Sequence, residues 1–182
     1  MRRSFLALPF ALALAFGLSS AAQADTPTAI RSAASFSAKC IGLANNGSTA
    51  NGTKLVLWDC HGGVDQSWFG RSDVSIRSFA GTNKCVGLAN NGSTANGTSL
   101  VLWDCHGHND QRWVLTPTFD GNHHYLIRNS KSGKCAGLAN NGSTANGTSL
   151  VLWDCHQGAD QRWVLPEPYN SGNSQFVYGF SR

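Results

Sequence analysis

Apolar and polar residues alternate in short runs along the chain, and no run repeats an apolar residue at helical spacing. In the run that begins at Leu55, Leu55 and Leu57 share one face of an extended chain, while Val56 and Trp58 share the other. Short alternating runs bounded by Gly- and Asn-rich segments predict β-strands joined by tight turns, with few helices. The leucine face is the natural core face, so Trp58 is expected to point outward, toward an Asn-Gly loop.

This pattern occurs three times. The copies begin at Lys39, Lys84 and Lys134, and over 32 residues the second and third differ at four positions and the first and second at seven. The period is 45 residues and then 50, and the extra residues lie between Trp113 and Ile127, where a loop insertion costs little. Each copy predicts four strands: a first strand (29–32, 74–78 and 125–129), a Lys-Cys-x-Gly-Leu strand, a Leu-Val-Leu-Trp-Asp-Cys strand and a strand that starts at Gln-x-Trp.

The threefold pattern predicts an all-β fold. One unit of about 45 residues cannot bury an apolar face alone, whereas three units can close a barrel without exposed edges. Twelve strands in three equal units predict a β-trefoil over residues 25–165. Its repeats are expected at about 28–70, 71–116 and 120–165. A sandwich would not explain the repetition, and three blades are too few for a propeller. The second tryptophan set is expected inside the barrel: Trp68, Trp113 and Trp163.

Both ends of the chain lie outside this pattern. Residues 1–24 combine Arg2 and Arg3, an apolar run and a small-residue site before Asp25, which predicts a secretory signal peptide cut after Ala24. The apolar run is shorter than the roughly 20 residues of a membrane-spanning helix. The protein is therefore expected to be secreted or periplasmic. The tail at 166–182 is surplus to the trefoil, and we expect it to pack loosely through Phe176, Tyr178 and Phe180.

The six cysteines lie in pairs within the repeats. Six cysteines allow 15 pairings, and the repetition favours the one in which each repeat closes its own bridge. In an exported protein a disulfide is a better interpretation than a metal site or free thiols. The expected pairs are Cys40 with Cys60, Cys85 with Cys105 and Cys135 with Cys155, each 20 residues apart.

Charge and motifs exclude several functions. Removing Arg2 and Arg3 with the signal peptide lowers the net charge from +4 to +2, too little for a nucleic-acid or membrane surface. The sequence has no nucleophile-elbow, zinc-protease or phosphate-loop motif, so no enzymatic activity and no cofactor are expected. We expect a monomer without a metal site, in which the histidines are exposed turn or loop residues: His61, His106, His156, His108, His123 and His124.

The repeated motifs resemble those of the ricin B-chain-like β-trefoil lectins over about residues 30–165. The resemblance rests on Cys-x-x-Leu, the Asn-Gly-Ser-Thr-Ala-Asn-Gly-Thr loop, Leu-Trp-Asp-Cys and Gln-x-Trp, present three times at matching spacing. It implies a carbohydrate-binding module with up to one shallow site per repeat and a stacking aromatic at Trp58, Trp103 and Trp153. Galactose-binding members carry an Asp two residues after the first cysteine, where this chain has Gly42, Gly87 and Gly137.

The expected site combines an aromatic face for the sugar ring with polar groups for its hydroxyls. Because the usual acid is absent, the carboxylate must come from the residue before Gln-x-Trp. The alternative for Asp65 and Gln66 is that they hydrogen-bond backbone within the hairpin, and the alternative function is a protein-interaction trefoil that serves a secreted enzyme or toxin. The candidate sugar-binding residues are Trp58, Asp65, Gln66 and Asn46; Trp103, Asp110, Gln111 and Asn91; and Trp153, Asp160, Gln161 and Asn141.

Overall fold

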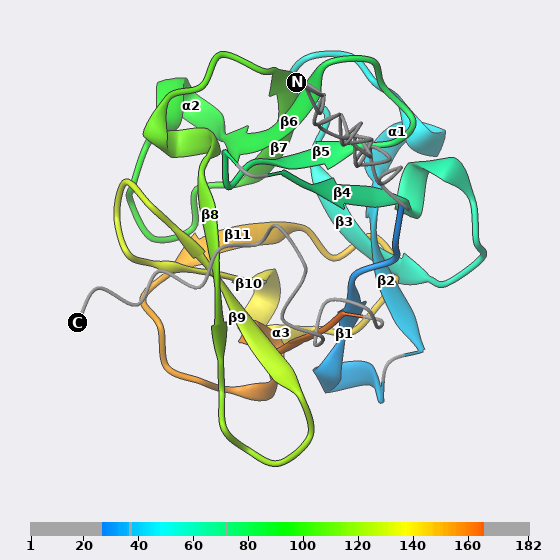
Figure 1. The fold of residues 1–182 in the computed structure, drawn as a ribbon. Coiled ribbons are helices and arrows are strands. Elements are labelled where there is room, and N and C mark those ends of the chain that lie inside the picture. Colours follow the sequence, from blue (N-terminus) through cyan, green and yellow to red (C-terminus); the bar gives the residue numbers. More distant parts are fainter. Residues whose placement is uncertain (1–26, 37, 72, 166–182) are drawn as a thin grey trace, which may run out of the picture.

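The three copies fold into three similar four-stranded units that form one β-trefoil (Figure 1). The computed structural model describes residues 27–36, 38–71 and 73–165, so the predicted signal peptide and the predicted contacts of the tail at 166–182 lie outside the described residues. Within the described part, no helix is long and apolar enough to cross a membrane. The strands are β1 (Arg31–Ser32), β2 (Lys39–Leu43), β3 (Leu55–Asp59), β4 (Trp68–Gly70), β5 (Ile76–Ser78), β6 (Lys84–Leu88), β7 (Leu100–Asp104), β8 (Trp113–Pro117), β9 (His124–Asn129), β10 (Cys135–Leu138), β11 (Leu150–Trp153) and β12 (Trp163–Val164).

The helical segments are all single turns, as the absence of a helical period predicted. The α turns lie between the second and third strand of each repeat, a 3₁₀ turn precedes each fourth strand, and one further 3₁₀ turn, η1, follows the first strand of the first repeat. The α turns are α1 (Ala44–Gly47), α2 (Ala89–Gly92) and α3 (Ala139–Gly142), and the 3₁₀ turns are η1 (Ala33–Ser35), η2 (Val64–Gln66), η3 (Asn109–Gln111) and η4 (Ala159–Gln161).

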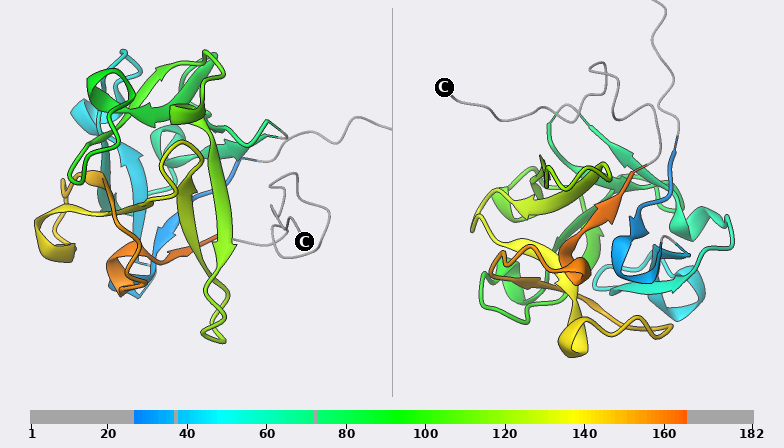
Figure 2. Two further views of the ribbon diagram at one scale, coloured as in Figure 1. Left: turned by 90° about the vertical axis from the view of Figure 1, so that its left-hand side faces the viewer. Right: turned by 90° about the horizontal axis from the view of Figure 1, so that it is seen from below.

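Strand pairing joins the start and the end of the trefoil. β1 pairs antiparallel with both β12 and β2, so the first repeat continues the sheet of the third. The extra residues of the second period form a long β8–β9 hairpin, which projects beyond the barrel (Figures 1 and 2). The insertion therefore lengthens a loop and leaves the threefold plan intact.

The second Asn-Gly of each loop connects neighbouring repeats. The Gly52 N–H donates to the Leu102 carbonyl at 2.8 Å, and the Leu102 N–H donates to the Thr53 carbonyl at 2.7 Å. The same exchange joins Gly97 and Thr98 to Leu152, and Gly147 and Thr148 to Leu57. Three equivalent exchanges close the barrel, which is why no repeat has to bury its apolar face alone.

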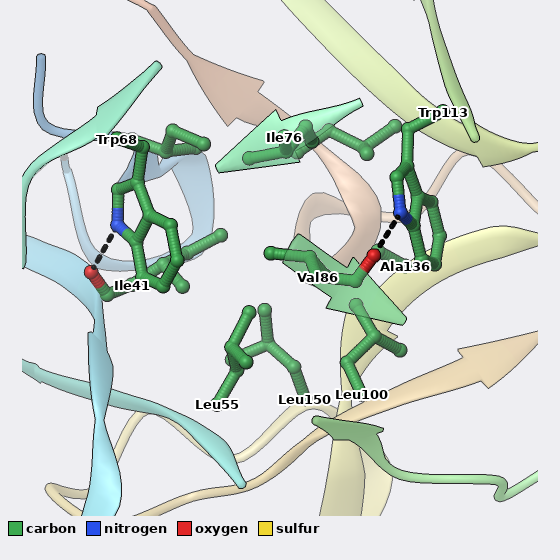
Figure 3. Close-up of a pocket in the computed structure, with 11 residues that line it drawn as sticks. Ile41, Leu55, Trp68, Ile76, Val86, Leu100, Trp113, Ala136 and Leu150 are labelled. Carbon is green, nitrogen blue, oxygen red and sulfur yellow. Dashed lines mark hydrogen bonds between the residues drawn. The ribbon is translucent and has the colours of Figure 1, made fainter. Parts of the chain in front are cut away.

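The barrel interior is closed to ligands. The leucine face of the third strand is buried, and the second tryptophan set lies inside, both as predicted. Figure 3 shows the Trp68 indole N–H donating to the Ile41 carbonyl and that of Trp113 to the Val86 carbonyl, each at 2.9 Å. The remaining cavity measures about 10 Å³ and has an apolar lining, so it has no room for more than a water and no polar partner for one. Any binding site must lie on the outside.

The three predicted disulfides are present. Cys40 bonds Cys60, Cys85 bonds Cys105 and Cys135 bonds Cys155, and no described cysteine is free. Each bridge closes a loop of about 20 residues and contributes on the order of 3 kcal/mol in the chain-entropy view. The bridges tie the second strand to the end of the third in every repeat.

One buried amide organises the end of each third strand. The Gln66 side chain is buried; its Nε2 donates to the Asp59 carbonyl and its Oε1 accepts from the His61 N–H, both at 2.9 Å. Gln111 and Gln161 make the equivalent bonds. The oxygen and one N–H of each amide are thus bonded to backbone. We therefore withdraw Gln66, Gln111 and Gln161 from the sugar-binding set and assign them to hairpin geometry.

A polar clamp crosses each repeat boundary on the surface. Lys39 Nζ donates to Asp59 Oδ1 at 2.6 Å and to Asn146 Oδ1 at 2.7 Å, and Asn146 Nδ2 donates to Asp59 Oδ2 at 2.6 Å. These hydrogen bonds hold the pKa of Asp59 below its ordinary value of 3.8, with the largest contribution from Lys39 and the next from Asn146. The equivalent clamps are Lys84, Asp104 and Asn51, and Lys134, Asp154 and Asn96.

The β8–β9 hairpin carries a separate carboxylate cluster. Asp120 accepts from the Asn122 N–H at 3.0 Å, lies 2.6 Å from His124 Nδ1 and accepts from Arg162 Nη1 at 3.2 Å. These contacts, chiefly the Asn122 amide, lower the pKa of Asp120 to about 2. Arg162 directly precedes β12, which pairs with β9, so this contact ties the loop of the inserted hairpin to the last strand of the third repeat.

Replacing the buried amide tests its structural role. Gln66→Met keeps the volume but leaves the His61 N–H and the Asp59 carbonyl without their partner, so we expect the free energy of unfolding to fall by about 1–3 kcal/mol. Val64→Ala on the same 3₁₀ turn is the control, because Val64 is exposed and should change stability by less than about 0.5 kcal/mol. Urea unfolding with the disulfides intact measures both, and equal stabilities of the two variants would contradict the assignment.

Acid unfolding tests the clamps. The pKa of each clamp aspartate is lower in the folded chain than its ordinary value of 3.8. Such a carboxylate stabilises the fold fully at a pH above its pKa in the unfolded chain. The stabilisation is lost as the pH falls through the pKa of the folded chain. The triple variant Asn51→Ala, Asn96→Ala and Asn146→Ala removes one cause of the lowered pKa values. Its deficit in unfolding free energy should be largest at neutral pH and shrink as the pH falls below about 4. A deficit that is constant from pH 7 to pH 2 would show that the asparagines act without the aspartates.

Candidate functional site

A shallow cavity lies on the outer side of the third strand, and it is defined in the first two repeats. In the first repeat it measures about 440 Å³ and is lined by Trp58, His61, Asp65 and the α1 turn, with Gly147 from the third repeat. In the second repeat it measures about 360 Å³ and is lined by Trp103, His106, His108, Asp110 and the α2 turn. Cavities of this size are typical of small-ligand sites.

The outward tryptophan forms one wall. Trp58, Trp103 and Trp153 are 46%, 45% and 46% exposed, as the alternation in their strands predicted. A Cβ placed on Gly147 would lie 3.8 Å from Cζ3 of Trp58, so the ring rests beside the second Asn-Gly of the neighbouring repeat. Gly52 and Gly97 hold the same position beside Trp103 and Trp153. Each ring thus keeps a fixed orientation with part of its surface open to solvent.

The aspartate forms the opposite wall. Asp65 lies in the middle of η2, and its carboxylate Oδ2 is 3.5 Å from His61 Nε2. The Gly63 N–H donates to His61 Nδ1 at 3.1 Å, so a neutral His61 ring carries its proton on Nε2, facing Asp65. Within the described ranges, His61 Nε2 at 3.5 Å is the one donor group that faces the Asp65 carboxylate. Its oxygens therefore remain available to accept bonds from a ligand.

Asp65 lies near the glycine that stands where galactose-binding members carry an acid. A Cβ added at Gly42 would lie 3.7 Å from Asp65 Oδ2 and 3.2 Å from Gln66 Cγ. At Gly87 and Gly137 the corresponding distances to Oδ2 of Asp110 and Asp160 are 3.7 and 3.6 Å. The carboxylate of the 3₁₀ turn is thus in van der Waals reach of the space beside the glycine, and the glutamine stem lies closer still.

The first Asn-Gly of each loop shapes the rim. Asn45 and Asn46 have φ values of 55°, and Gly47 has a φ of 78°, so α1 is a tight turn with three successive positive φ values. Asn tolerates this region better than most residues. A Cβ on Gly47 would lie 2.9 Å from Cβ of Asp65, so the turn packs directly on the aspartate. The candidate Asn46 and its partner Asn45 therefore line the cavity above Asp65.

The histidine after the second cysteine is a cavity residue that the sequence interpretation missed. His61, His106 and His156 are solvent-accessible, as expected, but each faces the aspartate four residues later, at 3.5, 3.7 and 3.5 Å. The His-x-x-x-Asp spacing, present in all three copies, was the available signal. The first two repeats therefore each offer an aromatic face, a carboxylate, an imidazole and loop amides around one hollow.

Comparisons with known proteins agree with this architecture. The chain superposes on a designed threefold-symmetric protein, ThreeFoil, with a TM-score of 0.68 at 24% identity, covering 76% of this chain and 96% of that one. It superposes on a Macrolepiota procera ricin B-like lectin, solved in complex with lactose, with a TM-score of 0.64 at 20% identity, covering 82% and 100%. It also matches an exo-β-1,3-galactanase from Clostridium thermocellum with a TM-score of 0.68 at 25% identity, over 77% of this chain but 30% of that enzyme.

Sequence comparison gives the same family. A search of curated protein sequences returned no match. The family model for the ricin-type β-trefoil lectin domain matches residues 26–163, which include β1 to β11, the start of β12 and both cavities described above. The chain therefore belongs to the ricin-type β-trefoil lectin family.

Proposed function

We propose that this protein is a non-catalytic lectin that binds carbohydrate in up to three equivalent pockets, one for each repeat. The observation that carries the proposal is that Trp58 and Asp65 line one cavity, with the aspartate in van der Waals reach of the space beside Gly42. A sugar needs an aromatic face for its C–H patch and fixed acceptors for its hydroxyls. Trp58 supplies the first and Asp65 the second.

The composition of the cavity argues for binding without catalysis. Hydrolysis of a glycosidic bond usually requires two carboxylic groups on opposite sides of the bond. In the two cavities delimited among the described residues, Asp65 is the only carboxylate of the first and Asp110 the only one of the second. The galactanase that shares this fold is matched over 30% of its length, which fits a binding module beside a catalytic one.

Solved relatives support a carbohydrate ligand. The Macrolepiota procera lectin was solved in complex with lactose, and an earthworm R-type lectin half with GalNAc. Both are below 25% identical to this chain, so they support the class of ligand and leave the particular sugar open. The replacement of the usual acid by Asp65 suggests that hydroxyl selection differs from that of galactose-binding members.

Three pockets on one rigid body suit clustered glycans. Pockets on separate repeats would let one molecule engage several sugars at once. Simultaneous engagement can raise the effective affinity by about 10²-fold or more without new contacts. Individually weak, shallow sites are therefore compatible with firm attachment to a glycan-bearing surface.

We also propose that the chain is exported, with residues 1–24 removed and the trefoil acting outside the cytoplasm. Three disulfides are typical of proteins that fold in an oxidising compartment. The mass of the exported chain would correspond to a start at Asp25 if the signal peptide is cut after Ala24. A chain retained in the cytoplasm would argue against this part of the proposal.

A glycan array followed by calorimetry tests the sites. The triple variant Trp58→Ala, Trp103→Ala and Trp153→Ala should lose the stacking face in every pocket and weaken binding at least tenfold. The triple variant Asp65→Asn, Asp110→Asn and Asp160→Asn keeps the shape but loses the charged acceptor, worth about 1.5–3 kcal/mol per ligand hydrogen bond. We therefore expect each pocket to weaken by at least about tenfold in it as well.

Phe119→Ala is the matched control, because this ring is 85% exposed and lies on the hairpin tip away from the cavities. It should bind as the parent does. A parent protein that binds no glycan, or triple variants that bind like the parent, would contradict the proposed function.

A further inference from the structure

The cavity of the second repeat contains a group of side chains that the other two repeats lack. Between the second cysteine and the aspartate, this repeat reads His106-Gly107-His108-Asn109-Asp110. The positions that match His108 are Gly63 and Gly158. A second imidazole is therefore present in one repeat only. The backbone conformation at this position is nearly the same in the first two repeats, with φ and ψ of −76° and 162° at His108 and of −70° and 160° at Gly63.

The three side chains converge. One ligand atom each from His106, His108 and Asp110 lies within 4.8 Å of the others, the one such group of three among the described residues. His106 Nε2 is 3.7 Å from Asp110 Oδ2, and the two imidazole rings are 4.6 Å apart between centroids. In a tetrahedral zinc site with bonds of about 2.0–2.1 Å, neighbouring ligand atoms lie roughly 3.3 Å apart. Small side-chain rotations at the surface suffice to reach that spacing.

We propose that His106, His108 and Asp110 form a transition-metal site of the zinc type, specific to the second repeat. Two imidazoles and one carboxylate are ligands that Zn²⁺ prefers, and three protein ligands leave a fourth position for an external group. The ligands lie two and four residues apart on one short loop. The buried Gln111 amide, which holds the His106 N–H at 2.9 Å, fixes one end of that loop.

Two neighbouring contacts bear on this site. The His108 N–H donates to His106 Nδ1 at 3.3 Å. A metal on Nε2 moves the ring proton to Nδ1, so this long hydrogen bond is exchanged for the metal bond. Lys131 brings a positive charge to the same rim, but its Nζ donates to the Gly92 carbonyl at 2.6 Å and forms no ion pair with Asp110 in the structure. Lys131 therefore does not block the Asp110 carboxylate on the side of His106 and His108.

Metal binding would change the second repeat alone. Asp110 is the acceptor of the proposed sugar pocket, so zinc bound to it would close that pocket and leave those of the first and third repeats working. This consequence rests on the proposed lectin function, whereas the metal site itself does not. Zinc would then lower the number of sugar sites per chain from three to two.

Zinc titration of the untagged chain by calorimetry tests the site, with one Zn²⁺ bound per chain as the expected result. His108→Gly introduces the glycine that the first and third repeats have at this position, and it should weaken zinc binding at least tenfold. His123→Asn is the control, because this exposed loop histidine lies outside the cluster and asparagine suits its positive φ of 55°. ¹⁵N NMR should show the His106 ring changing its protonated nitrogen on saturation, a signature that an altered fold would not give.

A second variant, which adds the same ligands to the third repeat, tests the site independently of any effect of His108→Gly on the fold. The variant Gln157→Gly, Gly158→His and Ala159→Asn gives the third repeat the loop of the second, and it should bind two Zn²⁺ per chain. Zinc binding that survives His108→Gly, or that is lost in His123→Asn, would overturn the site. A chain that binds zinc as expected but no glycan would refute the lectin function alone, and three sugar sites retained in saturating zinc would refute only the closing of the pocket.

Discussion

The fold and its surface cavities both depend on one buried amide in each repeat. Gln66 joins the Asp59 carbonyl to the His61 N–H, so it sets the path of the chain between the third strand and the 3₁₀ turn. That path fixes the positions of Trp58 near the end of the strand, of His61 after it and of Asp65 in the turn. An unsatisfied buried amide is costly, so this geometry has little freedom to drift. The cavity residues are therefore placed by a side chain whose amide is bonded to backbone at both its oxygen and its nitrogen.

Each site is also a product of two repeats. Gly147 and its neighbours close the barrel against the third strand of the first repeat, and the same glycine lies beside Trp58. The surface clamp of Lys39, Asp59 and Asn146 joins the same two repeats. The contacts that complete the barrel thus also bring Gly147 into the lining of the first cavity.

The sequence predicted much of the fold because the signals were local or repeated. The leucine–tryptophan alternation, the cysteine pairs and the threefold period predicted the strands, disulfides and trefoil that the structure contains. The candidate site was harder, because it depends on register between segments. Nothing in the residue order shows that Asp65 reaches the space beside Gly42, or that Asn146 crosses to the first repeat. The tight turn at Asn46 and Gly47 was predicted, but its packing onto Asp65 was not. For the glutamines the sequence left two roles open, a sugar contact or a backbone bond, because sequence alone does not reveal burial.

The central claim is that sugar is bound on the outer tryptophan face and not in the barrel. NMR of the indole N–H signals, recorded while the best glycan from an array is titrated into the protein, tests it most directly. Trp58, Trp103 and Trp153 are half exposed, whereas Trp68, Trp113 and Trp163 are buried with their N–H groups bonded to backbone carbonyls. The account predicts that the first three signals shift and the second three stay in place. Shifts confined to the buried set, or no shift in any of the six, would contradict it.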